Sequence, residues 1–98
     1  MIKDVTSIFG YQQITGLSSA TNLTVPTRDL NGISTTPTVA IITVEGQGVR
    51  WRDDKIAPTA TVGMPVPNGG VLFYDGDLSN VQFIQQAAGA ILNVSYYK

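Results

Sequence analysis

The sequence predicts an all-β domain, built as a small antiparallel β-sandwich or a jelly-roll-like barrel. Apolar and polar residues alternate with a period of two along several short runs, which is the side-chain period of a β-strand. Clusters of Gly, Pro and Asn separate these runs, as they do in sandwiches and barrels. Only 13% of the 98 residues are charged, and polar uncharged residues take their place, which suits sheet faces or surfaces that a partner covers. At this length we expect residues 1–98 to form a single β domain.

Four runs predict the main strands. In chain order they are VAIITVEG (39–46), VRWR (49–52), VLFYDG (71–76) and AILNVSYY (90–97). The first two flank the glycine-rich connection 46–48, which predicts a tight hairpin, and PNGG at 67–70 is a turn by composition. The expected core side chains are those of Ile42, Val44, Trp51, Phe73, Phe83, Leu92 and Val94.

The remaining segments carry weaker patterns. In residues 78–89, Ser79 and Gly89 fit the two ends of a helix, whereas alternation around Val81 favours a strand. We expect a strand, with a helix as the alternative. A short strand is expected at 23–25. Residues 26–38 show no sustained period and are expected as an exposed loop that contacts a partner, and residues 1–11 are expected as an extended N-terminal arm.

Composition argues against several classes of protein. The net charge of −1 gives no basic footprint for nucleic acid. No apolar run approaches the ~20 residues of a membrane span, and the N-terminus lacks the apolar region of a signal peptide, so we expect synthesis in a host cytoplasm. The chain contains neither cysteine nor histidine, which removes the thiolate nucleophile, the commonest general base and the commonest metal ligands. We therefore expect no catalytic residues, no metal and no cofactor.

The stretch VRWRDD (49–54) concentrates the charged residues. On a strand, Arg50 and Arg52 share one face while Trp51 points to the other. Two interpretations of the arginines stay open: a solvated face with ion pairs to nearby aspartates, or a subunit interface, where Arg and Trp are over-represented. Asp53 and Asp54 are adjacent, so their side chains diverge on a strand and suit a polar turn better than acid–base catalysis.

Three phrases of the sequence carry a resemblance to a known class of proteins. They are VRWRDD (49–54), PTATVGMP (58–65) and LNVSYY (92–97). With the residues between them they resemble a block in small structural proteins of tailed bacteriophages, and the resemblance runs from Val44 to Lys98. The sequence departs from this pattern at position 55, where Lys stands in place of a Gly-type turn residue.

The resemblance implies a virion component: a capsid decoration (cement) protein, or a small head–tail or tail protein. A decoration protein of this kind would lie on the capsid surface, form a homo-oligomer, with a trimer expected, and bind the major capsid protein or other virion subunits. The candidate interface residues are Arg50, Trp51, Arg52, Tyr11, Arg28 and Tyr97.

Two other functions are weighed against this one. A carbohydrate- or receptor-binding module of a phage tail or neck would need an exposed patch formed by at least two of Tyr11, Tyr74, Tyr96 and Tyr97, with Asn or Asp alongside. A hydrolase would need two carboxylates from Asp53, Asp54, Asp75 and Asp77 to converge in one cleft. Asp75 and Asp77 lie in YDGDLSN (74–80), which we expect to be a turn between strands rather than a calcium loop.

Overall fold

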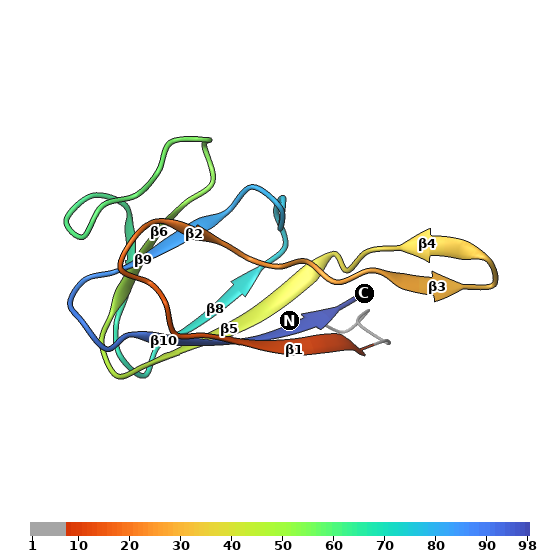
Figure 1. Ribbon diagram of the computed structural model, residues 1–98, viewed down its shortest axis with the longest axis horizontal. Coiled ribbons are helices and arrows are strands. Elements are labelled where there is room, and N and C mark those ends of the chain that lie inside the picture. The colour runs from red at the N-terminus through yellow and green to blue at the C-terminus, as the bar shows by residue number, and fades with distance from the viewer. Residues whose placement is uncertain (1–7) are drawn as a thin grey trace.

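The computed structural model describes residues 8–98, and this part of the chain is all-β, with antiparallel sheets and no helix (Figure 1). The strands are β1 (Ile8–Ile14), β2 (Thr21–Asn22), β3 (Arg28–Leu30), β4 (Ile33–Thr35), β5 (Val39–Glu45), β6 (Val49–Arg52), β7 (Met64–Val66), β8 (Val71–Tyr74), β9 (Gln82–Gln85) and β10 (Ile91–Tyr97). The four main predicted strands are thus confirmed as β5, β6, β8 and β10. The ambiguous segment, residues 78–89, contains strand β9. Residues 23–25, expected as a short strand, are not in a strand, and the two-residue strand β2 lies just before them.

Two four-stranded sheets form the body of the molecule. The first sheet has the order β1-β10-β5-β8 and the second the order β2-β9-β6-β7, while β3 and β4 pair only with each other. The two sheets share one cluster of buried apolar side chains, and they do not close into a barrel. That cluster comprises Ile14, Leu17, Leu23, Ala40, Ile42, Val44, Val49, Val66, Tyr74, Leu78, Val81, Phe83, Ala90, Leu92, Val94 and Tyr96.

The tight hairpin predicted at Gly46–Gly48 is wrong, because β5 and β6 belong to different sheets. Val44 and Val49 are both buried in the shared core, and crossing from one sheet to the other lets both point into it. Gly46 makes the crossing with a φ of 82°, and a Cβ on it would lie 2.2 Å from the carbonyl oxygen of Gly89. The glycine therefore serves a close approach between two backbone segments and not a two-residue hairpin turn.

The predicted core is confirmed except at one position. Phe73 was expected inside, but its side chain is 59% exposed, while that of Tyr74 is 6% exposed. On β8 the inward side chains are Leu72 and Tyr74, so the alternation of the strand turns Phe73 outward. Trp51 is only half-buried, although it packs against the core as expected.

Residues 26–38, expected as an exposed loop, contain the β3–β4 hairpin. Asn31 and Gly32 form its turn with φ values of 55° and 81°, the left-handed pair that a two-residue type I′ turn requires. The hairpin projects beyond the two sheets at one end of the molecule (Figure 1), whose overall dimensions are 43 × 25 × 22 Å. Residues 8–11 of the expected arm belong to β1, paired with β10, and residues 1–7 lie outside the described residues.

Candidate functional site

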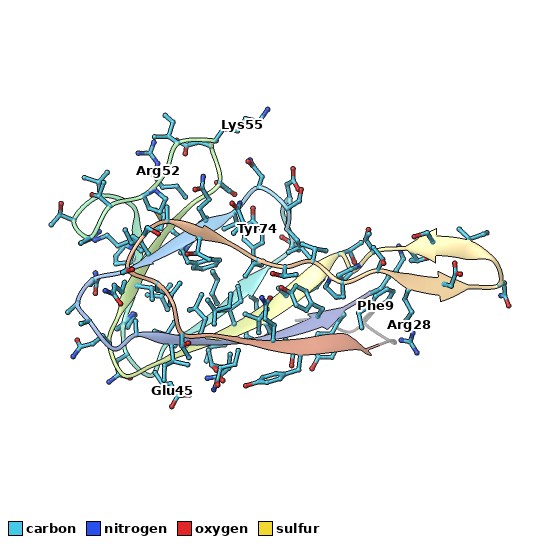
Figure 2. The ribbon with its side chains drawn as sticks, viewed as in Figure 1. Phe9, Arg28, Glu45, Arg52, Lys55 and Tyr74 are labelled. Carbon is cyan, nitrogen blue, oxygen red and sulfur yellow. The ribbon has the colours of Figure 1, made fainter. Side chains whose placement is uncertain are left out.

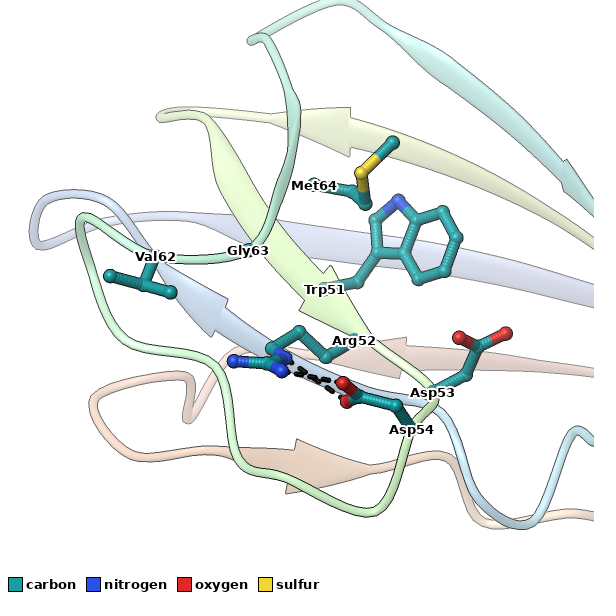
Figure 3. Close-up of a pocket in the computed structure, with 7 residues that line it drawn as sticks. All are labelled: Trp51, Arg52, Asp53, Asp54, Val62, Gly63 and Met64. Atoms are coloured by element: carbon teal, nitrogen blue, oxygen red, sulfur yellow. Dashed lines mark hydrogen bonds and ion pairs between the residues drawn. The ribbon is translucent and has the colours of Figure 1, made fainter.

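A surface hollow of about 390 Å³ lies where β6 ends and β7 begins (Figure 3). Its lining residues are Trp51, Arg52, Asp53, Asp54, Val62, Gly63 and Met64. The loop between β6 and β7, residues 53–63, forms one wall of the hollow. The structure thus places the VRWRDD stretch at a concave surface, where four of its residues bring apolar and charged side chains together.

Trp51, the aromatic residue that lines this hollow, packs against the buried Tyr74. The Trp51 ring meets the Tyr74 ring edge-on, with centroids 5.6 Å apart and planes at 72°. The Tyr74 hydroxyl donates a hydrogen bond to Asp53 Oδ2 at 2.7 Å, and Asn80 Nδ2 donates to the Asp53 carbonyl oxygen at 2.8 Å. Burial, followed by the neighbouring Asp53 carboxylate, raises the pKa of Tyr74 well above its ordinary value. Tyr74 therefore stays a neutral donor that holds Asp53 in place.

The Arg50 side chain donates hydrogen bonds to the main chain of the 53–63 loop. Its Nε donates to the Ala60 carbonyl oxygen at 3.2 Å, and its Nη1 donates to the Gly63 carbonyl oxygen at 2.8 Å. Because guanidinium groups donate in a fixed fork, this pair of bonds sets the path of the loop as it returns to β7. Sequence reasoning missed this role, since nothing in the pattern of residues 58–63 marks two carbonyl oxygens as acceptors.

Arg52 forms the ion pair that one of the two interpretations expected. Its guanidinium binds the Asp54 carboxylate through two donors, with Nε at 3.0 Å from Oδ1. The hydrogen bond with Arg52 lowers the pKa of Asp54, and the same bond raises the pKa of Arg52. Asp54 is exposed and Arg52 is only half-buried, so this pair contributes little to stability. It closes the start of the loop, two residues from the end of β6.

The two carboxylates of the hollow are held by different partners. The Asp53 and Asp54 side chains point in different directions, one bonded by Tyr74 and the other by Arg52 (Figure 3). Asp75 and Asp77 line a separate hollow of about 320 Å³. There Asp77 Oδ1 accepts bonds from the Ser79 amide and hydroxyl, in the turn that the sequence predicts.

The outer face of the first sheet is a second candidate surface. We use this name for the side chains directed away from the core, including those of Tyr11, Gln13, Ile41, Thr43, Glu45, Val71, Phe73, Asn93, Ser95 and Tyr97. Tyr11 is 61% exposed, and its hydroxyl donates to Asn93 Oδ1 at 2.6 Å. Asn93 Oδ1 also accepts from Gln13, and Asn93 Nδ2 donates to Glu45 Oε1 at 2.8 Å. Hydrogen bonds between polar side chains thus connect β1, β10 and β5 on this face.

The candidate interface residues fall at three separate places. Trp51 and Arg52 line the hollow, and Arg50 on the same strand binds the 53–63 loop. Tyr11 and Tyr97 lie on the outer face of the first sheet, and Arg28 lies at the base of the hairpin. The Arg28 guanidinium carbon stands 5.5 Å from the centre of the Phe9 ring, a cation–π contact between the hairpin and β1 (Figure 2). Of the other tyrosines, Tyr74 and Tyr96 are buried, and burial raises the pKa of Tyr96 to about 12.

The chain matches no protein-family model, no curated protein and no solved structure at a significant level. Within residues 8–98 the structure brings together no group of three acidic, His or Cys side chains that could hold a metal ion. The same residues include no helix of the length and apolar character needed to cross a membrane. The geometry of the surfaces described above therefore carries the functional argument.

Proposed function

We propose that this protein is a non-enzymatic structural protein of a phage particle, namely a capsid decoration (cement) protein that oligomerises and stabilises contacts between shell subunits. The observation that carries the proposal is the β3–β4 hairpin, which projects from the body and pairs with no other strand among the described residues. A projecting arm of this kind reaches a neighbouring subunit without disturbing the core to which it is attached.

The hairpin is suited to contacting a partner. Ile33 near its tip is 67% exposed, an apolar side chain with no core to enter. Strands that pair on one side only can add to the sheet edge of a partner through main-chain hydrogen bonds. Several such weak attachments on one oligomer combine through effective concentration, so a decoration protein binds a shell tightly without any single strong contact.

The finer architecture belongs to the same proposal. Two four-stranded antiparallel sheets that share one core favour a β-sandwich over a barrel. A jelly-roll-like arrangement of the same strands is the alternative. Either arrangement leaves the hairpin and the outer face of the first sheet available to subunits of the shell.

The copy number of this chain in purified particles tests the proposal. Quantitative mass spectrometry against the major capsid subunit is expected to give a ratio near one, or a simple fraction of one, as decoration of the whole surface requires. A few copies per particle would move the protein to the neck or tail. Absence from particles would overturn the virion proposal.

The hairpin itself can be tested with a matched pair of variants. Ile33→Lys is expected to weaken binding to particles that lack the protein by at least tenfold, because it places a charge at the exposed apolar tip. Ser34→Lys adds the same charge at the next position, which is also exposed, and is expected to bind nearly as well as the unchanged chain. Equal binding by both variants and the unchanged chain would remove the hairpin from the interface.

A carbohydrate- or receptor-binding module is the second candidate, and Tyr11 favours it. An exposed tyrosine ring beside the side chains of Asn93, Gln13 and Glu45 matches the stacking and hydrogen-bonding needs of a sugar. A glycan array tests this candidate directly. Binding that is lost in Tyr11→Ala would support it, and an array without hits would leave the decoration protein as the proposal.

A further inference from the structure

The four edges of the two sheets differ in how well they resist pairing with another strand. The first sheet ends at β1 and β8, and the second ends at β2 and β7. Strand β1 has a register irregularity between Ile8 and Gly10, β7 carries Pro65 at its centre, and β2 is two residues long. Bulges, prolines and short length are the features that proteins use to block edge-to-edge association. Strand β8, with the sequence VLFY, contains no proline and no charge, and the bulge formed by Gly69 and Gly70 opposite Val44 lies before its first residue.

The side chains of β8 also leave an apolar strip uncovered. Val71 is 53% exposed and Phe73 is 59% exposed. Phe73 lies opposite the half-buried Ile41 in the register of β5 and β8, so the strip continues onto the next strand. At the other edge of the same face, Tyr11 and Gln13 are tied into the polar network around Asn93. The apolar character is therefore concentrated beside the one unprotected edge.

The main chain of β8 is oriented for further pairing. The Val44 amide donates to the Gly70 carbonyl oxygen at 3.1 Å, and the Val44 carbonyl oxygen accepts from the Gly69 amide at 2.7 Å, so Val44 occupies a hydrogen-bonded position of the ladder with Gly69 as the extra residue of a bulge. Hydrogen-bonded pairs alternate along an antiparallel ladder, so in this register Leu72 and Tyr74 face β5. The amide and carbonyl groups of Val71 and Phe73 consequently point to the open edge. Four main-chain groups are thus available to a strand laid alongside.

We infer that β8 pairs antiparallel with β8 of a second copy of this chain, about a two-fold axis at Leu72, to form one continuous eight-stranded sheet. This register sets Val71 opposite the partner's Phe73 as a hydrogen-bonded pair, so a small side chain meets a large one on the same outer face. Asp75 of each copy lies beyond Tyr74, beside the uncharged turn at 67–70 that precedes β8 in the partner, so no like charges face each other. A second copy is the occupant because the strand is complementary to itself in both shape and charge.

The inference deepens the self-association in the proposed function, and it replaces the trimer that the phage resemblance implies with a two-fold pair. It is tested on the isolated full chain, without particles. A chain that dimerises but never enters particles would support the inference and overturn the proposed function. A monomer that decorates particles would do the reverse.

The molar mass of the chain in solution is the first measurement. Sedimentation over a concentration series is expected to give twice the monomer mass of 10.4 kDa. Phe73→Lys is expected to weaken dimerisation at least tenfold, because it puts two ammonium groups beside one axis. The control Tyr11→Lys places the same charge at the opposite edge of the same face and is expected to dimerise normally. A trimer or a monomer of the unchanged chain would overturn the inference. So would a result in which Tyr11→Lys dissociates the dimer and Phe73→Lys does not.

A disulfide provides a test that does not depend on weakening the interface. The natural chain has no cysteine, so Leu72→Cys introduces a single thiol. At the two-fold axis the two Leu72 positions form a non-hydrogen-bonded pair with Cα atoms about 4.5 Å apart, within disulfide range. Mild oxidation is expected to convert Leu72→Cys to a covalent dimer and to leave the control Tyr11→Cys monomeric on a denaturing gel. Equal cross-linking of both variants, or of neither, would contradict the pairing.

Discussion

Strand β10 and the β3–β4 hairpin are both antiparallel β-structure, yet different forces hold them. Strand β10 is paired on both sides, by β1 and by β5, and every second side chain along it is buried in the core. Within residues 8–98 the two strands of the hairpin pair only with each other, and their described side chains are mostly exposed. The comparison shows that burial in the core stabilises β10, whereas the left-handed turn at Asn31 and Gly32 determines the conformation of the hairpin. Changes in the two regions should therefore have separable effects.

Leu92→Ala is expected to show the largest effect. Leu92 is fully buried at 0% exposure on β10, so truncation removes apolar burial and leaves a cavity in the shared core. The free energy of unfolding is expected to fall by about 2–5 kcal/mol. Urea denaturation measures the loss. Ile33→Ala in the hairpin is the control, with a change within about 0.5 kcal/mol, and a loss comparable to that of Leu92→Ala would show that the hairpin supports the body.

Alkaline pH is expected to destabilise the body through its buried tyrosines. Burial raises the pKa of Tyr96 to about 12, above the value of about 10 in the unfolded chain. The stabilisation from the neutral hydroxyl is therefore fully present below pH 10 and is lost as the pH rises from 10 toward 12, by at most about 1.4 kcal/mol for each pH unit. Denaturation at fixed pH values measures this slope.

Tyr96→Phe separates the contribution of this residue. The variant is expected to lose the hydrogen bond from the Tyr96 hydroxyl to Gln12 Oε1, about 1 kcal/mol at neutral pH, and to show a shallower fall above pH 10. Tyr11→Phe is the control, because Tyr11 is exposed. An unchanged alkaline slope in Tyr96→Phe would show that another group controls the transition.

The smallest effect concerns two residues that share the left-handed backbone conformation. Asn31 has a φ of 55° in the hairpin and Lys55 has a φ of 67° in the loop beside the hollow. Asn tolerates this conformation and Lys does not, so Lys55→Gly is expected to raise the free energy of unfolding by up to about 1 kcal/mol, while Asn31→Gly leaves it nearly unchanged. Thermal denaturation compares the two variants. Destabilisation by Lys55→Gly would mean that the Lys55 side chain makes a stabilising contact.

The long strands could be predicted from the sequence because apolar and polar residues that alternate over four or more positions indicate a β-strand with one buried face. In β10 the two predicted core residues, Leu92 and Val94, are confirmed as buried, and the strand predicted in residues 78–89 in preference to a helix is confirmed as β9. The pairing of strands could not be predicted in the same way. Nothing local in the glycine-rich 46–48 connection reveals whether the chain folds back or crosses to the other sheet, and the crossing depends on contact with the distant Gly89.

The candidate site was only partly predictable for the same reason. The alternation of the strand predicted that Arg50 and Arg52 share one face of β6 and that Trp51 lies on the other. The Arg52–Asp54 ion pair could also be predicted, because its two residues are neighbours in the sequence. The bond from Tyr74 to Asp53 joins residues far apart in the chain, as does the edge contact of its ring with Trp51. In the hairpin, the Asn-Gly turn signal was present, but strands of three residues are too short for alternation to show.

The central position of β10 also governs when this protein folds. Strand β1 pairs with β10 in the register Ile14 opposite Leu92, and β5 pairs with its other side. While residues 91–97 remain inside the ribosome, β1 and β5 cannot be joined through β10, so β1 lacks the strand with which it pairs and one edge of β5 stays open. The first sheet therefore assembles only once residues 91–97 have left the ribosome, through contacts between distant residues of the kind that slow folding. Nascent chains that stall before residue 91 would present these unjoined strands to one another, which makes them prone to aggregation.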